Sequence, residues 1–163
     1  MTGTNVCYVG IDPGWQSFGI CVREPGGKPD VVGFVPANYP SFSEFLQEVR
    51  CRVKSESSVV LTIERFVPYG NVQSSAGEDT LMVIGALRYM FESAGAEVGL
   101  VRAIDWKQRL CKYLVKNKGF SNPSSSFDKK FSLAAAQALL GYSLKSDHEA
   151  DAVCLSFYGE IIK

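Results

Sequence analysis

Three acidic residues, each at the end of a different predicted element, constrain this chain more than any other feature. Asp12 and Glu64 each follow an apolar, strand-like run, and Asp151 lies near the start of the last predicted helix. A carboxylate beside a hydrophobic core is costly unless a cation or hydrogen bonds compensate its charge. Three such residues in one small chain therefore suggest that they converge on a divalent metal ion.

The order of the predicted elements is mixed. Short β-rich runs around the turn at residues 25–29 predict an antiparallel meander, and later apolar runs alternate with helical patterns. We expect Ser41 and Glu44 to form a capping box, and Asp105 and Asp147 to cap their helices. The predicted strands are residues 6–11, 18–22, 31–35, 59–63 and 96–101, and the predicted helices follow Ser41 or cover residues 75–93, 105–115, 127–140 and 147–161.

Length and composition predict one globular domain over residues 1–163. A hydrophobic content of 46% and a charged content of 21% are ordinary for a globular protein. No run approaches the roughly 18 apolar residues of a membrane span, and the first residues lack a signal-peptide pattern, so we expect a soluble, intracellular protein of the cytoplasm with no membrane partner. The five cysteines are scattered without a C-x-x-C pair, which indicates reduced thiols.

Positive charge is concentrated in one part of the chain, although the formal net charge is zero. Residues 100–130 contain eight Lys or Arg against two Asp, which is a local charge of +6. Such a patch can neutralise the phosphates of a nucleic acid, and a solvated helix face is the alternative explanation.

Three short motifs resemble the active-site blocks of RuvC-type Holliday junction resolvases. The motifs are Gly10-Ile11-Asp12-Pro13-Gly14, Ile63-Glu64 and His148-x-x-Asp151-Ala152. The resemblance extends over almost the whole chain and implies a ribonuclease H-like α/β fold. In that fold a mixed five-stranded sheet, formed by an antiparallel meander and then parallel strands, is flanked by helices.

The chemistry of phosphodiester hydrolysis fits these acidic residues. Two Mg²⁺ ions, for which Mn²⁺ can substitute, activate water and neutralise the transition state, and Mg²⁺ prefers carboxylate oxygens. We expect Asp12 to bridge both metals, with Glu64 on one and Asp151 on the other. His148 lies three residues before Asp151 on the same helix face, where it either ligates the metal or orients the attacking water.

The resemblance also implies residues that contact DNA. The segment after Glu64 matches a loop that reaches the junction centre in resolvases, and its residues Arg65, Phe66 and Tyr69 are candidates for DNA binding, one aromatic acting as a wedge. Lys107 resembles a lysine that acts at the scissile phosphate. The remaining candidates for phosphate contact are Arg109, Lys129 and Lys130.

These observations predict an Mg²⁺-dependent crossover junction endodeoxyribonuclease that nicks four-way branched DNA in pairs. Paired nicks need two active sites, so we expect a homodimer with a two-fold axis. The helix over residues 75–93 carries two apolar stripes. We expect one stripe to pack on the sheet and the other to contact the second subunit of the dimer. The first stripe is Val83, Leu87 and Met90, and the second is Met82, Ala86 and Tyr89.

A branch-migration helicase is a candidate partner of such a nuclease. Three alternatives stay open at this point. They are a ribonuclease H-like nuclease for RNA or other branched DNA, of the YqgF type, an ATPase-like fold that shares the Asp12 block, and a non-catalytic junction binder. An ATPase-like protein needs a second lobe, which 163 residues cannot supply, and an intact acidic set argues against a mere binder.

Overall fold

A five-stranded mixed sheet forms the centre of the computed structural model, which describes residues 6–53, 58–68 and 75–162. Its strand order is β3-β2-β1-β4-β5. The pairs β1–β2 and β2–β3 are antiparallel, whereas β1–β4 and β4–β5 are parallel. The predicted meander followed by parallel strands is therefore confirmed. The strands are β1 (Val6–Pro13), β2 (Phe18–Arg23), β3 (Asp30–Phe34), β4 (Ser58–Glu64) and β5 (Glu97–Val101).

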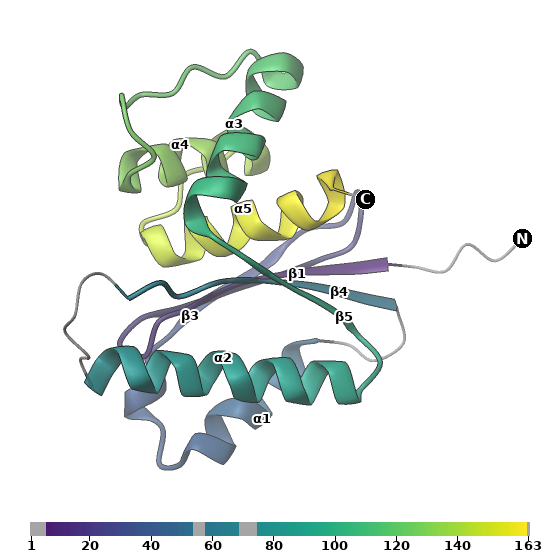
Figure 1. The fold of residues 1–163 in the computed structure, drawn as a ribbon. Coiled ribbons are helices and arrows are strands. Elements are labelled where there is room, and N and C mark those ends of the chain that lie inside the picture. Colours follow the sequence, from purple (N-terminus) through teal and green to yellow (C-terminus); the bar gives the residue numbers. More distant parts are fainter. Residues whose placement is uncertain (1–5, 54–57, 69–74, 163) are drawn as a thin grey trace, which may run out of the picture.

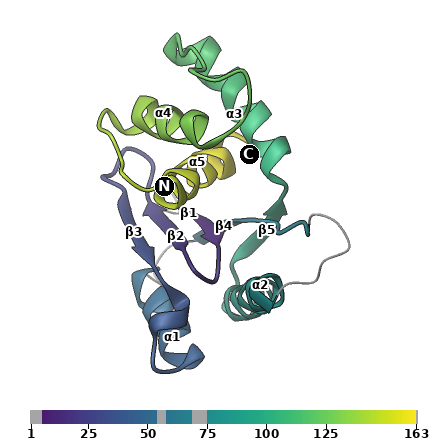
Figure 2. The ribbon, with the colours of Figure 1, turned by 90° about the vertical axis from the view of Figure 1, so that its left-hand side faces the viewer.

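Helices cover both faces of the sheet (Figures 1 and 2). The helices α1 (Phe42–Arg52) and α2 (Ser75–Ser93) lie on one face. On the other face α5 (Asp147–Ile161) packs directly on the strands, and α3 (Ala103–Lys118) and α4 (Lys129–Leu140) lie beyond it. A short 3-10 helix, η1 (Pro36–Asn38), precedes α1.

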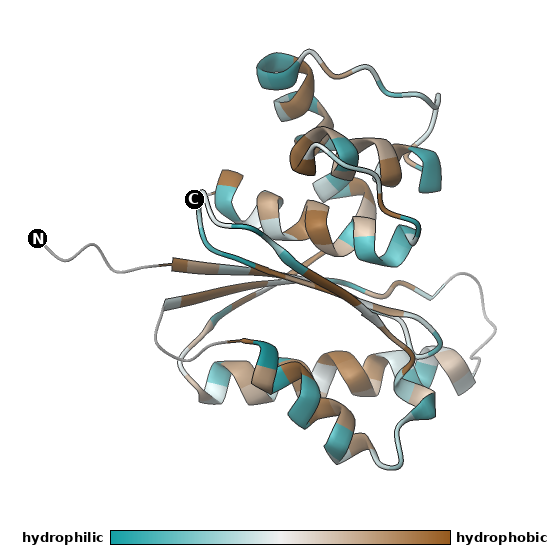
Figure 3. Cartoon of the chain, turned by 180° about the vertical axis from the view of Figure 1, so that it is seen from behind, coloured by the Kyte–Doolittle hydropathy of each residue, from teal (hydrophilic) through white to brown (hydrophobic). Residues whose placement is uncertain are grey.

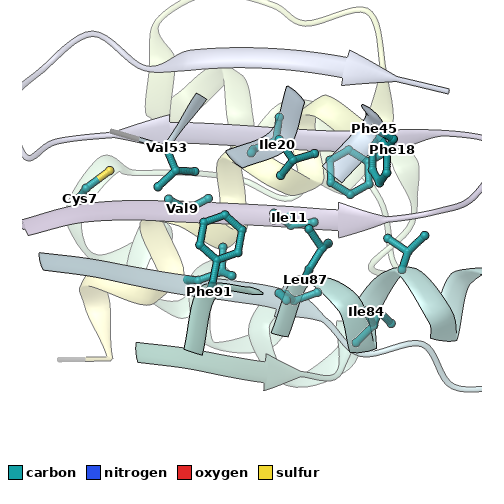
Figure 4. Packing of buried hydrophobic residues seen from close by; sticks show 14 residues of the cluster. Cys7, Val9, Ile11, Phe18, Ile20, Phe45, Val53, Ile84, Leu87 and Phe91 are labelled. Atoms are coloured by element: carbon teal, nitrogen blue, oxygen red, sulfur yellow. The ribbon is translucent and has the colours of Figure 1, made fainter. Parts of the chain in front are cut away.

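Side-chain alternation along the strands creates two separate cores. Cys7, Val9 and Ile11 of β1 point toward α1 and α2, where they pack with buried side chains such as Phe45 and Leu87 (Figure 4). The intervening residues of β1 face α5 instead. The second core lies among α3, α4 and α5 and includes the fully buried residues Trp106, Leu110, Leu114, Phe131 and Leu155.

The hydropathy of the chain follows this layered arrangement. In Figure 3 the central strands are mostly hydrophobic, whereas the helices carry both hydrophobic and hydrophilic residues. Strands covered on both faces need apolar side chains throughout, and a helix at the surface needs only one apolar stripe. Asp12 and Glu64 are therefore exceptional residues in the two central strands.

Glycines let α5 approach the sheet at backbone-contact distance. A Cβ atom on Gly10 of β1 would lie 2.0 Å from the carbonyl oxygen of Ala152, and one on Gly19 of β2 would lie 2.1 Å from the carbonyl oxygen of His148. Any side chain at these positions would push the helix away. The two glycines therefore fix the height of the first half of α5 above β1 and β2.

Two predicted helix caps, Asp147 and Asp105, and one predicted helix start, at residue 127, are wrong. Ser146, not Asp147, caps α5, and its hydroxyl accepts a hydrogen bond from the Glu149 amide. Arg102 precedes α3, so Asp105 lies within the first turn, where its carboxylate pairs with Arg102 at 2.7 Å. The helix expected from residue 127 begins at Lys129, because the Asp128 side chain accepts from the amides of Lys130 and Phe131.

Two other local predictions are confirmed. Ser41 caps α1 and accepts from the Glu44 amide, and all five cysteines are free thiols. Within the described residues, no helix has both the length and the apolar character that crossing a membrane requires.

Candidate active site

Strand register brings Asp12 and Glu64 to the same level of the sheet. Ile11 of β1 pairs with Ile63 of β4 in a parallel ladder, so the next residue on each strand is one of the two acids. The preceding side chains, Ile11 and Ile63, point to the face covered by α1 and α2. Because side chains alternate along a strand, Asp12 and Glu64 point to the face covered by α5. Two strand ends thus present neighbouring carboxylates to one helix.

The first turns of α5 add the remaining predicted residues. His148 Nδ1 lies 2.6 Å from Asp12 Oδ2, a hydrogen-bond distance. Asp151 follows three residues later on the same side of the helix, and its side chain is only 15% exposed. The close contact of α5 with Gly10 and Gly19 is what allows these side chains to reach the strand ends.

The helix α3 supplies two consecutive residues to the same site. The Lys107 ammonium lies 3.6 Å from Asp151 Oδ1, and the lysine is nearly buried. The indole N–H of Trp106 donates a hydrogen bond of 2.8 Å to Glu64 Oε2. Trp106 was not predicted from sequence, because an aromatic residue in a helix ordinarily signals only core packing. Its place directly before Lys107 is the one signal that could have indicated it.

Burial and mutual repulsion perturb the titration of the site. Burial first, and then the negative charge of Asp12, raise the pKa of Glu64 to about 7, against the opposing effect of the Trp106 hydrogen bond. Burial also raises the pKa of Asp151 to about 6, although Lys107 opposes that shift. The hydrogen bond to Asp12 raises the pKa of His148. Carboxylates that repel one another in a buried site favour binding of a cation.

The donor set of this site, three carboxylates and an imidazole, has the chemistry of a divalent-metal site but is not arranged to share an ion among the described residues. Asp151 Oδ1 is buried and has no hydrogen-bond partner among the described residues, so one strong acceptor is unused. Across residues 6–53, 58–68 and 75–162, however, no three His, Cys, Asp or Glu side chains stand close enough to share a metal ion in this conformation. His148 already engages Asp12 Oδ2, so a metal at that oxygen would have to displace the imidazole.

The other predicted DNA-contacting residues lie around this site or on the adjoining helices. Lys129 pairs with Asp147 at 2.9 Å, which ties the start of α4 to the start of α5. Arg109 and Lys130 are exposed. Lys129 is thus engaged by Asp147, whereas Arg109 and Lys130 have no ion pair to any of the three carboxylates among the described residues.

The segment after Glu64 is only partly described. Arg65 is exposed, whereas Phe66 is half-buried and packs against the core between the sheet and α1 and α2. Val67 is 46% exposed. Tyr69, the other predicted wedge, lies outside the described residues. Among the described residues of this segment, Val67 and Pro68 are the apolar ones exposed to solvent.

Comparison with solved structures identifies proteins of the same fold. T. thermophilus RuvC in complex with a Holliday junction substrate is similar with a TM-score of 0.62 and 19% identity, over 96% of this chain and 92% of that chain. The Thermus thermophilus RuvC structure gives a TM-score of 0.58 and 19% identity, over 94% of this chain and 91% of that chain. The predicted likeness to RuvC and the ribonuclease H-like fold are thereby confirmed. Neither known family models nor curated protein sequences give a match.

Proposed function

We propose that this protein is a metal-dependent endonuclease that resolves four-way DNA junctions. The observation that carries the proposal is the convergence of Asp12, Glu64 and Asp151 at one edge of the sheet, with Lys107 as the nearest buried cation. The RuvC fold, one example of which is bound to a Holliday junction, supports the same conclusion. A mere structural role would not explain two neighbouring carboxylates, Glu64 and Asp151, whose pKa values are raised by burial and by the negative charge of Asp12.

In this proposal Asp12, Glu64 and Asp151 are the residues that would hold two Mg²⁺ ions through their carboxylate oxygens, Asp12 serving both. Bound Mg²⁺ supplies charge neutralisation at the phosphate and makes water a better nucleophile. Lys107 contacts the scissile phosphate from α3. Once it releases Asp12, the imidazole of His148 would be free to hold a proton near the attacking or leaving oxygen.

We further propose that α2 forms the interface of a homodimer. Val83 and Leu87 are fully buried against the sheet, so this stripe is satisfied within the chain. On the other stripe, Met82 is 46% exposed and Tyr89 is 76% exposed. An apolar helix face in water fits contact with a second copy, which would supply the second active site needed for paired nicks.

The direct experiment compares three labelled substrates, namely a four-way junction, a linear duplex and a structured RNA. We expect Mg²⁺- or Mn²⁺-dependent nicking of two opposed strands of the junction, with little cleavage of the duplex or the RNA. EDTA should abolish cleavage, and Ca²⁺ should permit binding without turnover because its looser coordination does not enforce in-line geometry.

Substitution of the histidine adds a finer test of its role. His148→Ala should retain more cleavage than Asp12→Asn, because it removes a proton donor and not a bridging ligand. Full activity in EDTA would contradict the metal mechanism, and preferential cleavage of RNA would contradict the substrate.

A further inference from the structure

The contact between Trp106 and Glu64 constrains the one carboxylate of the site that comes from β4. Trp106 is fully buried in the core among α3, α4 and α5, so its indole ring has a fixed position. Its N–H lies 2.8 Å from Glu64 Oε2. An indole nitrogen only donates, and a buried donor without an acceptor is costly, so the tryptophan holds Glu64 in this orientation.

This hydrogen bond makes the two oxygens of Glu64 unequal. Oε2 accepts the hydrogen bond from the Trp106 indole, and Oε1 does not. A carboxylate that binds a cation through both oxygens must turn both of them toward the ion. The indole already occupies one lone-pair direction of Oε2, so an ion bound through both oxygens could reach Oε2 only from its other side, whereas binding through Oε1 leaves the hydrogen bond undisturbed.

We propose that Trp106 is a positioning residue that restricts Glu64 to one-oxygen ligation and thereby favours Mg²⁺ over Ca²⁺. Mg²⁺ requires six ligands in near-ideal octahedral geometry, whereas Ca²⁺ accepts six to eight ligands and often takes both oxygens of a carboxylate. A glutamate held to one oxygen therefore suits the smaller ion. This inference rests on the proposed metal-dependent nuclease but concerns which cation the site selects.

The neighbouring contact of Lys107 belongs to the same helical turn. Lys107 Nζ lies 3.6 Å from Asp151 Oδ1, so a shift of α3 would disturb two carboxylates together. A suitable control must therefore loosen α3 without touching Glu64. Leu110 lies one turn further along α3 and is fully buried in the same core. Leu110→Ala creates a cavity there and leaves the indole donor in place.

The test measures cation binding directly. Free Mn²⁺ is followed by its electron paramagnetic resonance signal in the presence of the full chain, and Mg²⁺ or Ca²⁺ is added as a competitor. Trp106→Phe should weaken Mg²⁺ binding by about tenfold, the lower end of the effect of losing a partner that orients a metal ligand. Ca²⁺ binding should change by less than about twofold. Leu110→Ala should leave the ratio of the two affinities at its wild-type value.

The outcomes separate this inference from the proposed function. A wild-type protein that binds no Mn²⁺ would overturn the metal site itself. A wild-type protein that binds Mn²⁺, together with a Trp106→Phe variant that weakens both competitors equally, would overturn only the role assigned to Trp106.

A second replacement covers the case in which Trp106→Phe does not fold. In a Trp15→Phe background, the remaining tryptophan is replaced biosynthetically by benzothienylalanine, which has nearly the same shape but no N–H. The same loss of Mg²⁺ preference is expected there, and an unchanged preference would overturn the proposal.

Discussion

Replacing Gly10 by alanine puts a methyl group where α5 lies against β1. The new Cβ would lie 2.0 Å from the carbonyl oxygen of Ala152 and 2.4 Å from the amide nitrogen of Ser156. Both atoms belong to the backbone of α5, so no side-chain rotation relieves the overlap. Ordinary contact begins at 3.4 Å, so the helix must move away from the strand by about 1.4 Å.

A movement of this size affects both stability and the site. Overpacking typically costs about 1–3 kcal/mol, and a displaced helix also loses dispersion contacts along its length. We therefore expect the free energy of unfolding to fall by about 3 kcal/mol, out of a total on the order of 5–15 kcal/mol. Asp151 is adjacent to Ala152 and would move with it, and a misplacement of about 1 Å can lower a reaction rate on the order of 100-fold.

Urea unfolding measures the loss of stability. Junction cleavage, assayed at a temperature where the variant is folded, measures the effect on the site. Gly99→Ala is the matched control, because a Cβ at this position of β5 meets only the Leu61 carbonyl oxygen, at 3.9 Å. Its free energy of unfolding should stay within about 0.5 kcal/mol of wild type. A Gly10→Ala variant that is equally stable, with cleavage unchanged, would refute the close seating of α5 on β1.

Three further predictions follow from the site and from α2. Cleavage in Mg²⁺ should be abolished by each of the substitutions Asp12→Asn, Glu64→Gln and Asp151→Asn. Junction binding in gel-shift assays should change by less than about twofold, because Lys and Arg side chains hold the phosphates. A variant that cleaves within about tenfold of wild type would remove that residue from the metal site. Without added metal, stability should fall as pH rises, because the pKa of Glu64 is raised from 4.5 to about 7, and the folded state therefore binds this proton more tightly than the unfolded state does. The stabilisation is full below pH 4.5 and is lost as pH rises through about 7, and it amounts to about 3 kcal/mol. Burial raises the pKa of Asp151 to about 6 and Asp12 raises the pKa of His148, so both residues act in the same direction. Urea midpoints at pH 5 and pH 8 measure this, Glu64→Gln should reduce the dependence without abolishing it, and midpoints that rise with pH would contradict it. Tyr89→Glu should convert a dimer to a monomer in sedimentation, whereas Lys116→Glu on α3 should not, and a dimeric Tyr89→Glu variant would place the interface elsewhere.

The sequence predicted the parts of this structure that follow from local pattern. Apolar runs that end in Asp12 and Glu64 placed both acids at strand ends, and the spacing of His148 and Asp151 placed those two residues on one helix face. Parallel pairing then brings the strand ends together without further information. The turn at residues 25–29 also predicted the antiparallel meander, whereas the parallel strands were expected only from the resemblance to RuvC-type resolvases.

The parts that were missed depend on contacts between distant segments. The hydrogen bond from Trp106 to Glu64 exists only because α3 packs across the end of β4. The roles of Gly10 and Gly19 also require the position of α5, since a glycine in a strand ordinarily only weakens it.

The errors in helix starts have a local cause. Ser146 and Asp147 are neighbours that can both cap a helix, and pattern alone does not choose between them. At α3 the predicted cap, Asp105, is instead engaged by Arg102. Sequence therefore identified all five α-helices of the described residues and the first residues of α1, α2 and α5, but not those of α3 and α4.

The two separate cores divide the molecule into parts that can change independently. Every described group of the candidate site comes from the sheet or from the layer of α3 and α5, whereas the exposed stripe of α2 belongs to the opposite layer. The layer of α1 and α2 would thus set how far apart two active sites stand in a dimer, and the other layer would set the chemistry of each. If the proposed function holds, substitutions in one layer would change the spacing of the two sites and leave the residues of each candidate site the same.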